Sequence, residues 1–395
     1  MFFEITKKEH KRNGFCSYHE FDNFIISCDG GWSHAQIDNR WVLFKGYTDD
    51  LKLSDTISSV MMDDVCGNYC VIAVDEHEQI SISTNKYRSF PLKYNENTIT
   101  NFDITRIDGK DAFSDSNITS DSNLVVSERV FDAVGNCDLD YSLTESEILS
   151  NMDELLYDKV SSFIHHNDLP LKIILSGGLD SMLVYSYIKR ITSDYELLSY
   201  QHFDYDKFWC NHGNSIKNSN WSYNQLHHWL DKSMLVSGAP GDEFMMRNPM
   251  IFNVLLNHRG VNITEYFDGR DNYHSKFIER ESYVDKMNKQ TASLSDLQSK
   301  ASNEIVYYLC NILSNDYQHH HLGETLTFTP LRDIKLVKMF MQLPTESLIG
   351  QATNGDITRA LISKNDPKLL HYISPYKNCG ECMANVSNLV LGIET

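Results

Sequence analysis

The stretch Ser-Gly-Gly-Leu-Asp-Ser at 176–181 places two hydroxyls, two glycines and a carboxylate in one short turn. The apolar run 171–175 before it predicts a strand, and 181–190 after it predicts a helix. Glycine backbone and the N–H groups at a helix start can approach an anion closely. Asp180 would repel a bare phosphate, so it predicts Mg²⁺ between carboxylate and phosphate. The turn therefore predicts a Mg²⁺–pyrophosphate site; the alternative is a Gly-Gly turn whose serines and aspartate only cap the helix.

A second turn with similar chemistry, Ser-Gly-Ala-Pro-Gly-Asp-Glu at 237–243, ends the predicted strand 233–238. Ligands of parallel sheets bind beyond the carboxyl ends of strands, so the two turns are expected at one edge. Asp242 would then be a second metal-binding carboxylate. Taken alone, the turn is equally compatible with a surface turn that has an acidic N-cap.

The elements that would carry these turns differ between the two parts of the chain. Up to about residue 130 the sequence consists of short β-rich runs, with a hairpin predicted at 71–83. The polar stretch 109–124 is predicted to be a linker or long loop. Helical periodicity begins after Thr144, which with Glu147 fits a capping box.

From residue 171 strands and helices alternate, and from about residue 243 the chain is expected to be mostly helical. Strands separated by helices predict a parallel sheet. We therefore expect an α/β protein with a β-rich domain at 1–130 and a parallel-sheet domain with a helical C-terminal part at 131–395.

Composition limits the classes of function. A net charge of −19 over 395 residues disfavours non-specific binding of nucleic acid. No apolar run approaches the roughly 20 residues of a membrane span, and the N-terminus does not resemble a signal peptide, so a cytoplasmic protein is expected. Nine scattered cysteines do not suggest a secreted disulfide framework. The sequence allows a homodimer but leaves the oligomeric state open.

The stretch at 176–181 resembles the pyrophosphate loop (PP-loop) of the N-type ATP pyrophosphatases. The wider pattern resembles the asparagine synthetase and β-lactam synthetase family. Its Ser-Gly-x-Gly-x-Asp-Glu segment is similar to 236–244, and its Arg-x-Pro-Phe-Leu-Asp segment to 328–344. Its lysine-bearing stretch is similar to 357–378, and the hairpin and strand of its glutaminase-like domain are similar to 67–94. The resemblance implies an N-terminal Ntn-hydrolase-like sandwich followed by an adenine-nucleotide α-hydrolase-like domain.

The resemblance also implies a carbon–nitrogen ligase that converts ATP to AMP and pyrophosphate. ATP would activate a small-molecule carboxylate as an acyl-adenylate, which an amine then attacks to form an amide. Mg²⁺ would be held by Asp180 and Asp242, and the expected catalytic residues are Lys377 and Glu243. For Lys377 the alternative is a solvated surface lysine. The ATP-binding residues would be Leu175, Ser176, Gly177, Gly178, Leu179, Asp180, Ser181 and Gly238.

Two departures from the family pattern refine this expectation. The family's glutaminases use an N-terminal cysteine, but Phe2 stands at that position and the nearest cysteine is Cys16. We therefore expect ammonia or a substrate amine, and not glutamine, as the nitrogen source. In the second turn Ala239 and Pro240 replace the family's glutamate region, and only 237 − 180 = 57 positions separate Asp180 from Ser237. Aspartate is therefore not expected to be the substrate.

Cys379 and Cys382 supply half of a zinc site, with Cys210, His212, Cys310 and His319 to His321 as further ligand candidates. The alternative is two ordinary thiols. Cysteine clusters of this kind occur in pyrophosphatase relatives that modify nucleobases, so adenylation of a nucleobase or nucleotide is a rival function. A non-catalytic nucleotide-binding protein is a second rival.

Overall fold

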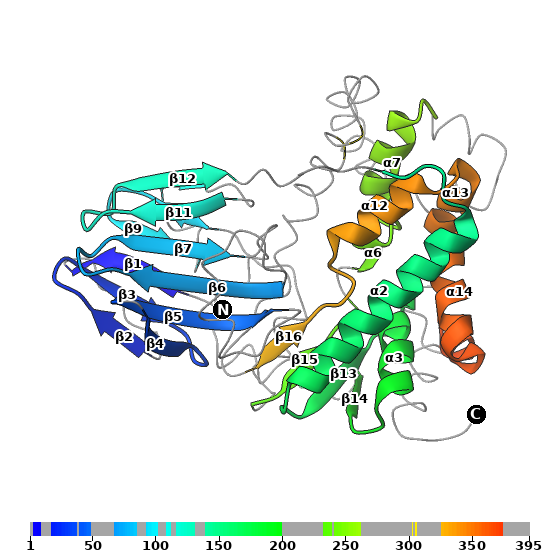
Figure 1. Cartoon of the computed structure of the whole chain (residues 1–395), viewed down its shortest axis with the longest axis horizontal. Helices are drawn as coiled ribbons and strands as arrows, with labels where there is room; N and C mark the ends of the chain where they lie inside the picture. Colours follow the sequence, from blue (N-terminus) through cyan, green and yellow to red (C-terminus); the bar gives the residue numbers. More distant parts are fainter. Residues whose placement is uncertain are drawn as a thin grey trace.

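A computed structural model of the chain describes residues 3–8, 17–37, 39–48, 67–84, 92–101, 108–111, 116–130, 139–199, 232–238, 241–261, 302, 305 and 325–373. Two antiparallel sheets occupy one side of the molecule, and a parallel sheet with helices occupies the other (Figure 1). Below, residues 3–130 are called the two-sheet half and residues 139–373 the parallel-sheet half.

The two-sheet half has two antiparallel sheets of six strands each among the described residues. The first has the order β10-β8-β9-β1-β3-β2 and the second β12-β11-β7-β6-β5-β4. The strands are β1 (Phe3–Lys7), β2 (Ser17–Glu20), β3 (Phe24–Cys28), β4 (Ser33–Ile37), β5 (Arg40–Thr48), β6 (Gly67–Val74), β7 (Ile80–Thr84), β8 (Lys93–Tyr94), β9 (Thr98–Thr100), β10 (Lys110–Asp111), β11 (Ser116–Ser120) and β12 (Val126–Val130).

One apolar core joins these two sheets. Phe3 and Ile26 of the first sheet and Leu43, Ile72 and Ile82 of the second belong to it, each no more than 1% exposed. Alternate residues of β1, β3, β5, β6 and β7 supply this core, as the period of two along a strand requires. The half is therefore a β-sandwich.

Two predictions for this half can be compared with the structure. The hairpin predicted at 71–83 is confirmed, since β6 and β7 pair antiparallel with Val74 opposite Ile80. The prediction of a linker or long loop at 109–124 is wrong, because β10 and β11 lie within it and β11 pairs with both β7 and β12. The apolar residues Ile118 and Leu124 are 1% exposed, and their burial in the sandwich core outweighs the polar residues around them.

The parallel-sheet half is built on four strands in the order β14-β13-β15-β16, all parallel. They are β13 (Leu171–Leu175), β14 (Glu196–Ser199), β15 (Met234–Val236) and β16 (Leu326–Phe328). The strands β13 and β15 correspond to the strands predicted at 171–175 and 233–238. The fourth, β16, lies in the stretch expected to be mostly helical. It pairs with β15 from Met234–Leu326 to Val236–Phe328.

Helices pack beside this sheet (Figure 1). They are α2 (Glu145–His166), α3 (Leu179–Ile191), α6 (Gly241–Phe244), α7 (Pro249–His258), α12 (Ile334–Gln342), α13 (Thr345–Asn354) and α14 (Asp356–Asn365), followed by the 3₁₀ helix η7 (Pro367–Tyr372). The predicted capping box of α2 is confirmed: Thr144 Oγ1 accepts from the Glu147 N–H at 3.3 Å, and the Glu147 carboxylate accepts from the Thr144 N–H at 2.8 Å. No helix among the described residues is long and apolar enough to span a membrane.

Three aromatic rings connect the two halves. Tyr47 of β5 lies 4.9 Å from the ring of Phe163 on α2 and 5.5 Å from that of Phe328 on β16, measured between centroids. Phe163 and Phe328 stack at 3.6 Å. Tyr47 is 6% exposed and belongs to the core of the parallel-sheet half, so the sandwich packs directly on that half.

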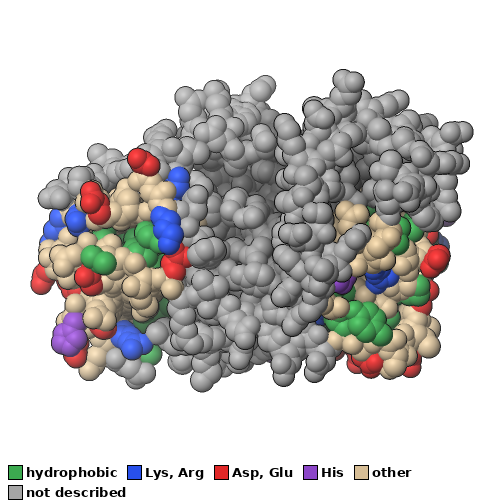
Figure 2. Space-filling model, turned by 90° about the horizontal axis from the view of Figure 1, so that it is seen from above, with side chains coloured by type: hydrophobic (Ala, Val, Ile, Leu, Met, Phe, Trp, Pro, Cys, Tyr) green, Lys and Arg blue, Asp and Glu red, His purple; other side chains and the backbone are tan. Residues whose placement is uncertain are grey.

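The described surface is mixed in charge. Seen from above, acidic and basic side chains alternate over the two-sheet half, and acidic side chains also mark the other half (Figure 2). Among described residues the large apolar side chains with high exposure are Val125 and Tyr141, at 66% and 61%. Overall, the structure is a mixed α/β protein with antiparallel sheets and a parallel four-stranded sheet.

Candidate functional site

The predicted pyrophosphate loop lies between β13 and α3, at the carboxyl end of the strand. Gly177 has φ +77°, a conformation that favours glycine, whereas Gly178 is the extended N-cap of α3 with φ −83°. Only Gly177 therefore needs to be glycine for its backbone angles. Leu175, the last residue of β13, and Leu179, the first of α3, are buried and anchor the loop at both ends.

Hydrogen bonds between the two serines hold the loop in shape. Ser176 Oγ lies 3.1 Å from Ser181 Oγ and accepts from the Gly178 N–H at 3.3 Å, while the Ser176 N–H donates to Ser181 Oγ at 3.2 Å. Ser181 Oγ also donates to the Gly178 carbonyl at 3.0 Å. The side chains expected to bind phosphate thus organise the loop themselves. The N–H groups of the first turn of α3 have no acceptor within the helix, so they remain the natural anion donors.

The second predicted turn lies directly against the first. A Cβ atom on Gly238 would stand 2.3 Å from the Ser181 nitrogen and 2.4 Å from the Asp180 carbonyl carbon. On Gly241 it would stand 2.3 Å from Asp180 Cγ. Both positions therefore require glycine, because any side chain there would clash with Asp180 or Ser181 at the start of α3. Ala239 and Pro240, between them, lie outside the described residues.

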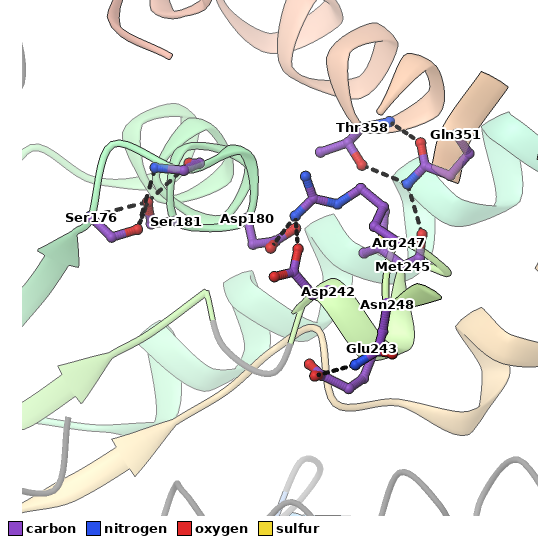
Figure 3. Close-up of polar contacts among 11 residues, drawn as sticks. Ser176, Asp180, Ser181, Asp242, Glu243, Met245, Arg247, Asn248, Gln351 and Thr358 are labelled. Atoms are coloured by element: carbon purple, nitrogen blue, oxygen red, sulfur yellow. Dashed lines mark hydrogen bonds and ion pairs between the residues drawn. The ribbon is translucent and has the colours of Figure 1, made fainter. Parts of the chain in front are cut away.

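Asp180 and Asp242, the predicted metal ligands, are brought together by an arginine that the sequence analysis did not consider. Arg247 Nη2 donates to Asp180 Oδ2 and, at 2.5 Å, to Asp242 Oδ1 (Figure 3). Burial alone would lower the pKa of Arg247, but the charges of the two aspartates outweigh burial and raise it. The guanidinium is therefore fully charged between the carboxylates.

The turn that carries Arg247 is tightly bonded. The N–H groups of Arg247 and Asn248 both donate to the Asp242 carbonyl, at 2.8 and 2.6 Å, and Met246 has φ +54°. Gln351, fully buried, donates through Nε2 to the Met245 carbonyl at 2.8 Å. The backbone that presents the guanidinium is thus fixed by Asp242 itself and by α13.

Glu243, a predicted catalytic residue, is half-buried beside this cluster. Its Oε1 accepts from Asn248 Nδ2 at 3.1 Å (Figure 3). The other predicted catalytic residue, Lys377, lies outside the described residues, as do Phe2, Cys16, Cys379, Cys382 and the further zinc-ligand candidates Cys210, His212, Cys310 and His319 to His321. Those predictions stay predictions.

Asp180 and Asp242 are the carboxylates available to Mg²⁺ at this site. Within the described part of the chain no group of three or more His, Cys, Asp or Glu side chains is arranged to hold a metal. Mg²⁺ at nucleotide sites is usually held by one or two carboxylates, with substrate phosphates and water supplying the rest. Asp180 and Asp242 converge on a single nitrogen atom, so their oxygens are close enough for one cation. The pair fits Mg²⁺, provided that the guanidinium moves.

A cavity of about 340 Å³ lies elsewhere in this half, at the end of α7 and of α12. Tyr141, His258, Arg259 and Gln342 are among its lining residues, and none of the predicted site residues lines it. Burial lowers the pKa of Arg259, whose guanidinium donates to the Met341 carbonyl at 2.6 Å. This cavity is separate from the loop, so it gives no support to the candidate site, which is argued from the geometry of the two turns alone.

Comparison with protein-family models gives no match for the chain, and no curated protein matches it significantly.

Proposed function

We propose that this protein is an ATP-dependent amide-bond-forming ligase of the asparagine synthetase type, which releases AMP and pyrophosphate. The observation that carries the proposal is the meeting of two turns at the carboxyl ends of the adjacent parallel strands β13 and β15. One supplies a glycine-dependent loop and the start of a helix, and the other supplies a second carboxylate beside Asp180. That combination suits an anion accompanied by a divalent cation.

The reaction proceeds in two balanced steps. An oxygen of the substrate carboxylate bonds to the α-phosphorus of ATP, the bond from that phosphorus to the bridging oxygen breaks, and pyrophosphate leaves with the electron pair. The nitrogen of ammonia or a substrate amine then bonds to the acyl carbon and loses a proton, and AMP departs. Mg²⁺, when bound, neutralises phosphate charge.

The chain's own residues bind and orient in this scheme. The N–H groups at the start of α3 bind pyrophosphate oxygens, and the Ser176–Ser181 hydrogen bonds keep those N–H groups in place. Asp180 and Asp242 would hold Mg²⁺ there. Glu243 and Lys377 remain the catalytic candidates, Glu243 because it adjoins Asp242. A structural zinc at Cys379 and Cys382 remains a separate proposal.

One observation favours a second candidate function. Arg247 already supplies a cation to Asp180 and Asp242, as it would in a nucleotide-binding protein that performs no catalysis. The ligase would release pyrophosphate from ATP and the non-catalytic protein would not, so one pyrophosphate assay distinguishes them.

The deciding experiment is a pyrophosphate-release screen with ATP and Mg²⁺ over carboxylates, including amino acids, with ammonia and polyamines as amines, and with nucleotides as a separate arm. Asp180→Ala should lower substrate-dependent release by on the order of a hundredfold or more, because the developing phosphate charge loses its metal. Asp168→Ala is the matched control, since Asp168 is an exposed aspartate that precedes β13 at the end opposite the loop. Undiminished release by Asp180→Ala would refute the metal assignment, and binding of ATP without any turnover would favour the non-catalytic alternative.

A further inference from the structure

Arg247 has a place in this site that neither the loop motif nor the family resemblance assigns. Its side chain and that of Asp180 are each 14% exposed, and that of Asp242 is 33% exposed. One nitrogen, Nη2, contacts both carboxylates (Figure 3). The guanidinium therefore lies where a metal ion shared by the two aspartates would lie.

One guanidinium is shared by two carboxylates in this cluster. Arg247 contacts Asp180 and Asp242, and the charge of Glu243 also acts on its guanidinium. Carboxylates held this close repel one another, and a cation between them lowers that repulsion strongly where solvent is scarce. The structure thus meets part of the need for positive charge with its own side chain.

The guanidinium can leave the two carboxylates and return, because only the end of a long side chain has to move. The backbone of Arg247 is fixed by its hydrogen bond to the Asp242 carbonyl, and among the described residues its buried Nε has no hydrogen-bond partner. Rotation about the side-chain bonds would free both carboxylates without unfolding the turn. The Asp242 carbonyl would keep its hydrogen bonds to the N–H groups of Arg247 and Asn248 throughout.

We propose that Arg247 is the resident counter-ion of the Asp180–Asp242 pair, and that a divalent cation must displace its guanidinium to bind there. This inference rests on the proposed metal-dependent function and names how metal access is controlled. In the nucleotide-free protein the carboxylates are already neutralised in part, so a metal ion alone binds weakly. Removal of the guanidinium would leave the same two carboxylates open to a metal.

The test measures binding of Mn²⁺ alone to the nucleotide-free, full-length protein by titration calorimetry or by the electron paramagnetic resonance signal of free Mn²⁺. Arg247→Gln removes the cation, and we expect it to bind Mn²⁺ at least about fivefold more tightly than the wild type, the lower end of typical coupling between two binding events. Arg247→Lys keeps a positive charge and should bind Mn²⁺ as weakly as the wild type. Addition of Asp180→Asn to Arg247→Gln should abolish the gain.

Arg247→Gln could also destabilise the fold by leaving two carboxylates face to face. In that event Mn²⁺ should raise its melting temperature more than that of the wild type, because the ion replaces the missing charge. A folded Arg247→Gln protein with unchanged or weaker Mn²⁺ affinity would overturn the inference, as would a variant that stays unfolded with Mn²⁺.

This readout uses no nucleotide, so its outcome is independent of catalysis. Loss of the expected Mn²⁺ gain together with intact pyrophosphate release would refute the role of Arg247 alone. A clear Mn²⁺ gain in a protein that never releases pyrophosphate would refute the ligase and leave the counter-ion role standing.

Discussion

Each half of the molecule has a cationic side chain in contact with carboxylate, and the two sites differ in the number of carboxylates that the cation contacts. In the sandwich, Lys45 of β5 is completely buried, and its Nζ lies 2.8 Å from Asp29 Oδ2 and 2.6 Å from the Gly30 carbonyl. Asp29 Oδ1 accepts from Trp32 Nε1 at 2.8 Å. One ammonium thus faces one carboxylate, and each oxygen of that carboxylate has its own donor.

In the parallel-sheet half, one guanidinium faces two carboxylates directly, with a third beside them. This cluster lies on turns at the ends of strands, whereas Lys45 lies within a strand. Lys45 and Asp29 form a one-to-one pair inside the core, which we call the balanced pair. Arg247 is shared between two carboxylates, which we call the unbalanced cluster, and it lies on strand-end turns, where ligands of parallel sheets bind. We expect the first arrangement to stabilise the fold and the second to accept a further cation.

The largest expected effect comes from breaking the balanced pair. Asp29→Ala should lower the free energy of unfolding by about 3–5 kcal/mol, because it leaves the fully buried Lys45 ammonium without its carboxylate. Urea unfolding followed by circular dichroism would measure this loss.

The matched control is Lys45→Met, which removes the cation instead. Asp29 is 18% exposed and keeps the Trp32 donor, so this variant should lose less stability than Asp29→Ala. Neither variant should regain stability with Mn²⁺, in contrast to Arg247→Gln. Rescue of Asp29→Ala or Lys45→Met by Mn²⁺ would show that the two sites do not differ as described.

Sequence reasoning predicted the frame of the parallel-sheet half well. Apolar runs bounded by turns predicted β13 and β15, and Thr144 with Glu147 predicted the start of α2, because these signals are local. The strand β16 was missed, since three residues within a longer mixed segment carry no periodicity. Its pairing with β15 is a tertiary contact that composition does not encode.

The candidate site was accessible to sequence reasoning only where a local motif exists. The two turns predicted Asp180 and Asp242 as metal ligands, whereas Arg247 follows the second turn and matches no motif. Its role depends on the fold of residues 242–248, where one carbonyl accepts two N–H groups. Likewise, Lys45 interrupts an otherwise apolar strand, and that interruption was the available signal of a buried pair.

A second prediction concerns the contact that assembles the unbalanced cluster. Gly238→Ala would place a methyl group 2.3 Å from the Ser181 nitrogen. The atoms that it would meet belong to the backbone of Asp180 and Ser181, which can move only if the loop or the turn is distorted. We expect a loss of about 1–3 kcal/mol in the free energy of unfolding. Thermal and urea denaturation would measure it.

Gly178→Ala is the matched control within the loop. Its φ is −83°, and the nearest atom to an added Cβ is Ser176 Oγ at 3.3 Å, on a side chain that can shift. The variant should lose about 0.5–1 kcal/mol, because alanine is a poorer N-cap than glycine, and so less than Gly238→Ala. Equal losses for the two variants would mean that close packing at Gly238 does not hold the turns together.

The smallest effect is expected at a balanced pair in the same half as the unbalanced cluster. Lys159 Nζ lies 3.0 Å from Asp333 Oδ2, and these side chains are 9% and 13% exposed. Burial alone would raise the pKa of Asp333, but the Lys159 charge and the Lys335 N–H outweigh burial, so the pKa is lowered. Asp333 also caps α12 through that N–H at 2.8 Å.

A lowered pKa means that ionised Asp333 stabilises the folded state more than protonated Asp333 does. Its stabilisation is therefore complete above the unfolded pKa of about 3.9 and is lost as pH falls through the lower folded value. Between pH 5 and pH 2 the unfolding free energy of the wild type should fall more steeply than that of Asp333→Asn, measured by urea unfolding at each pH. Lys159→Met should flatten the same curve, because it removes the charge that lowers the pKa. Parallel curves for all three proteins would mean that this pair, although balanced and buried, does not stabilise the fold as the Asp29–Lys45 pair does.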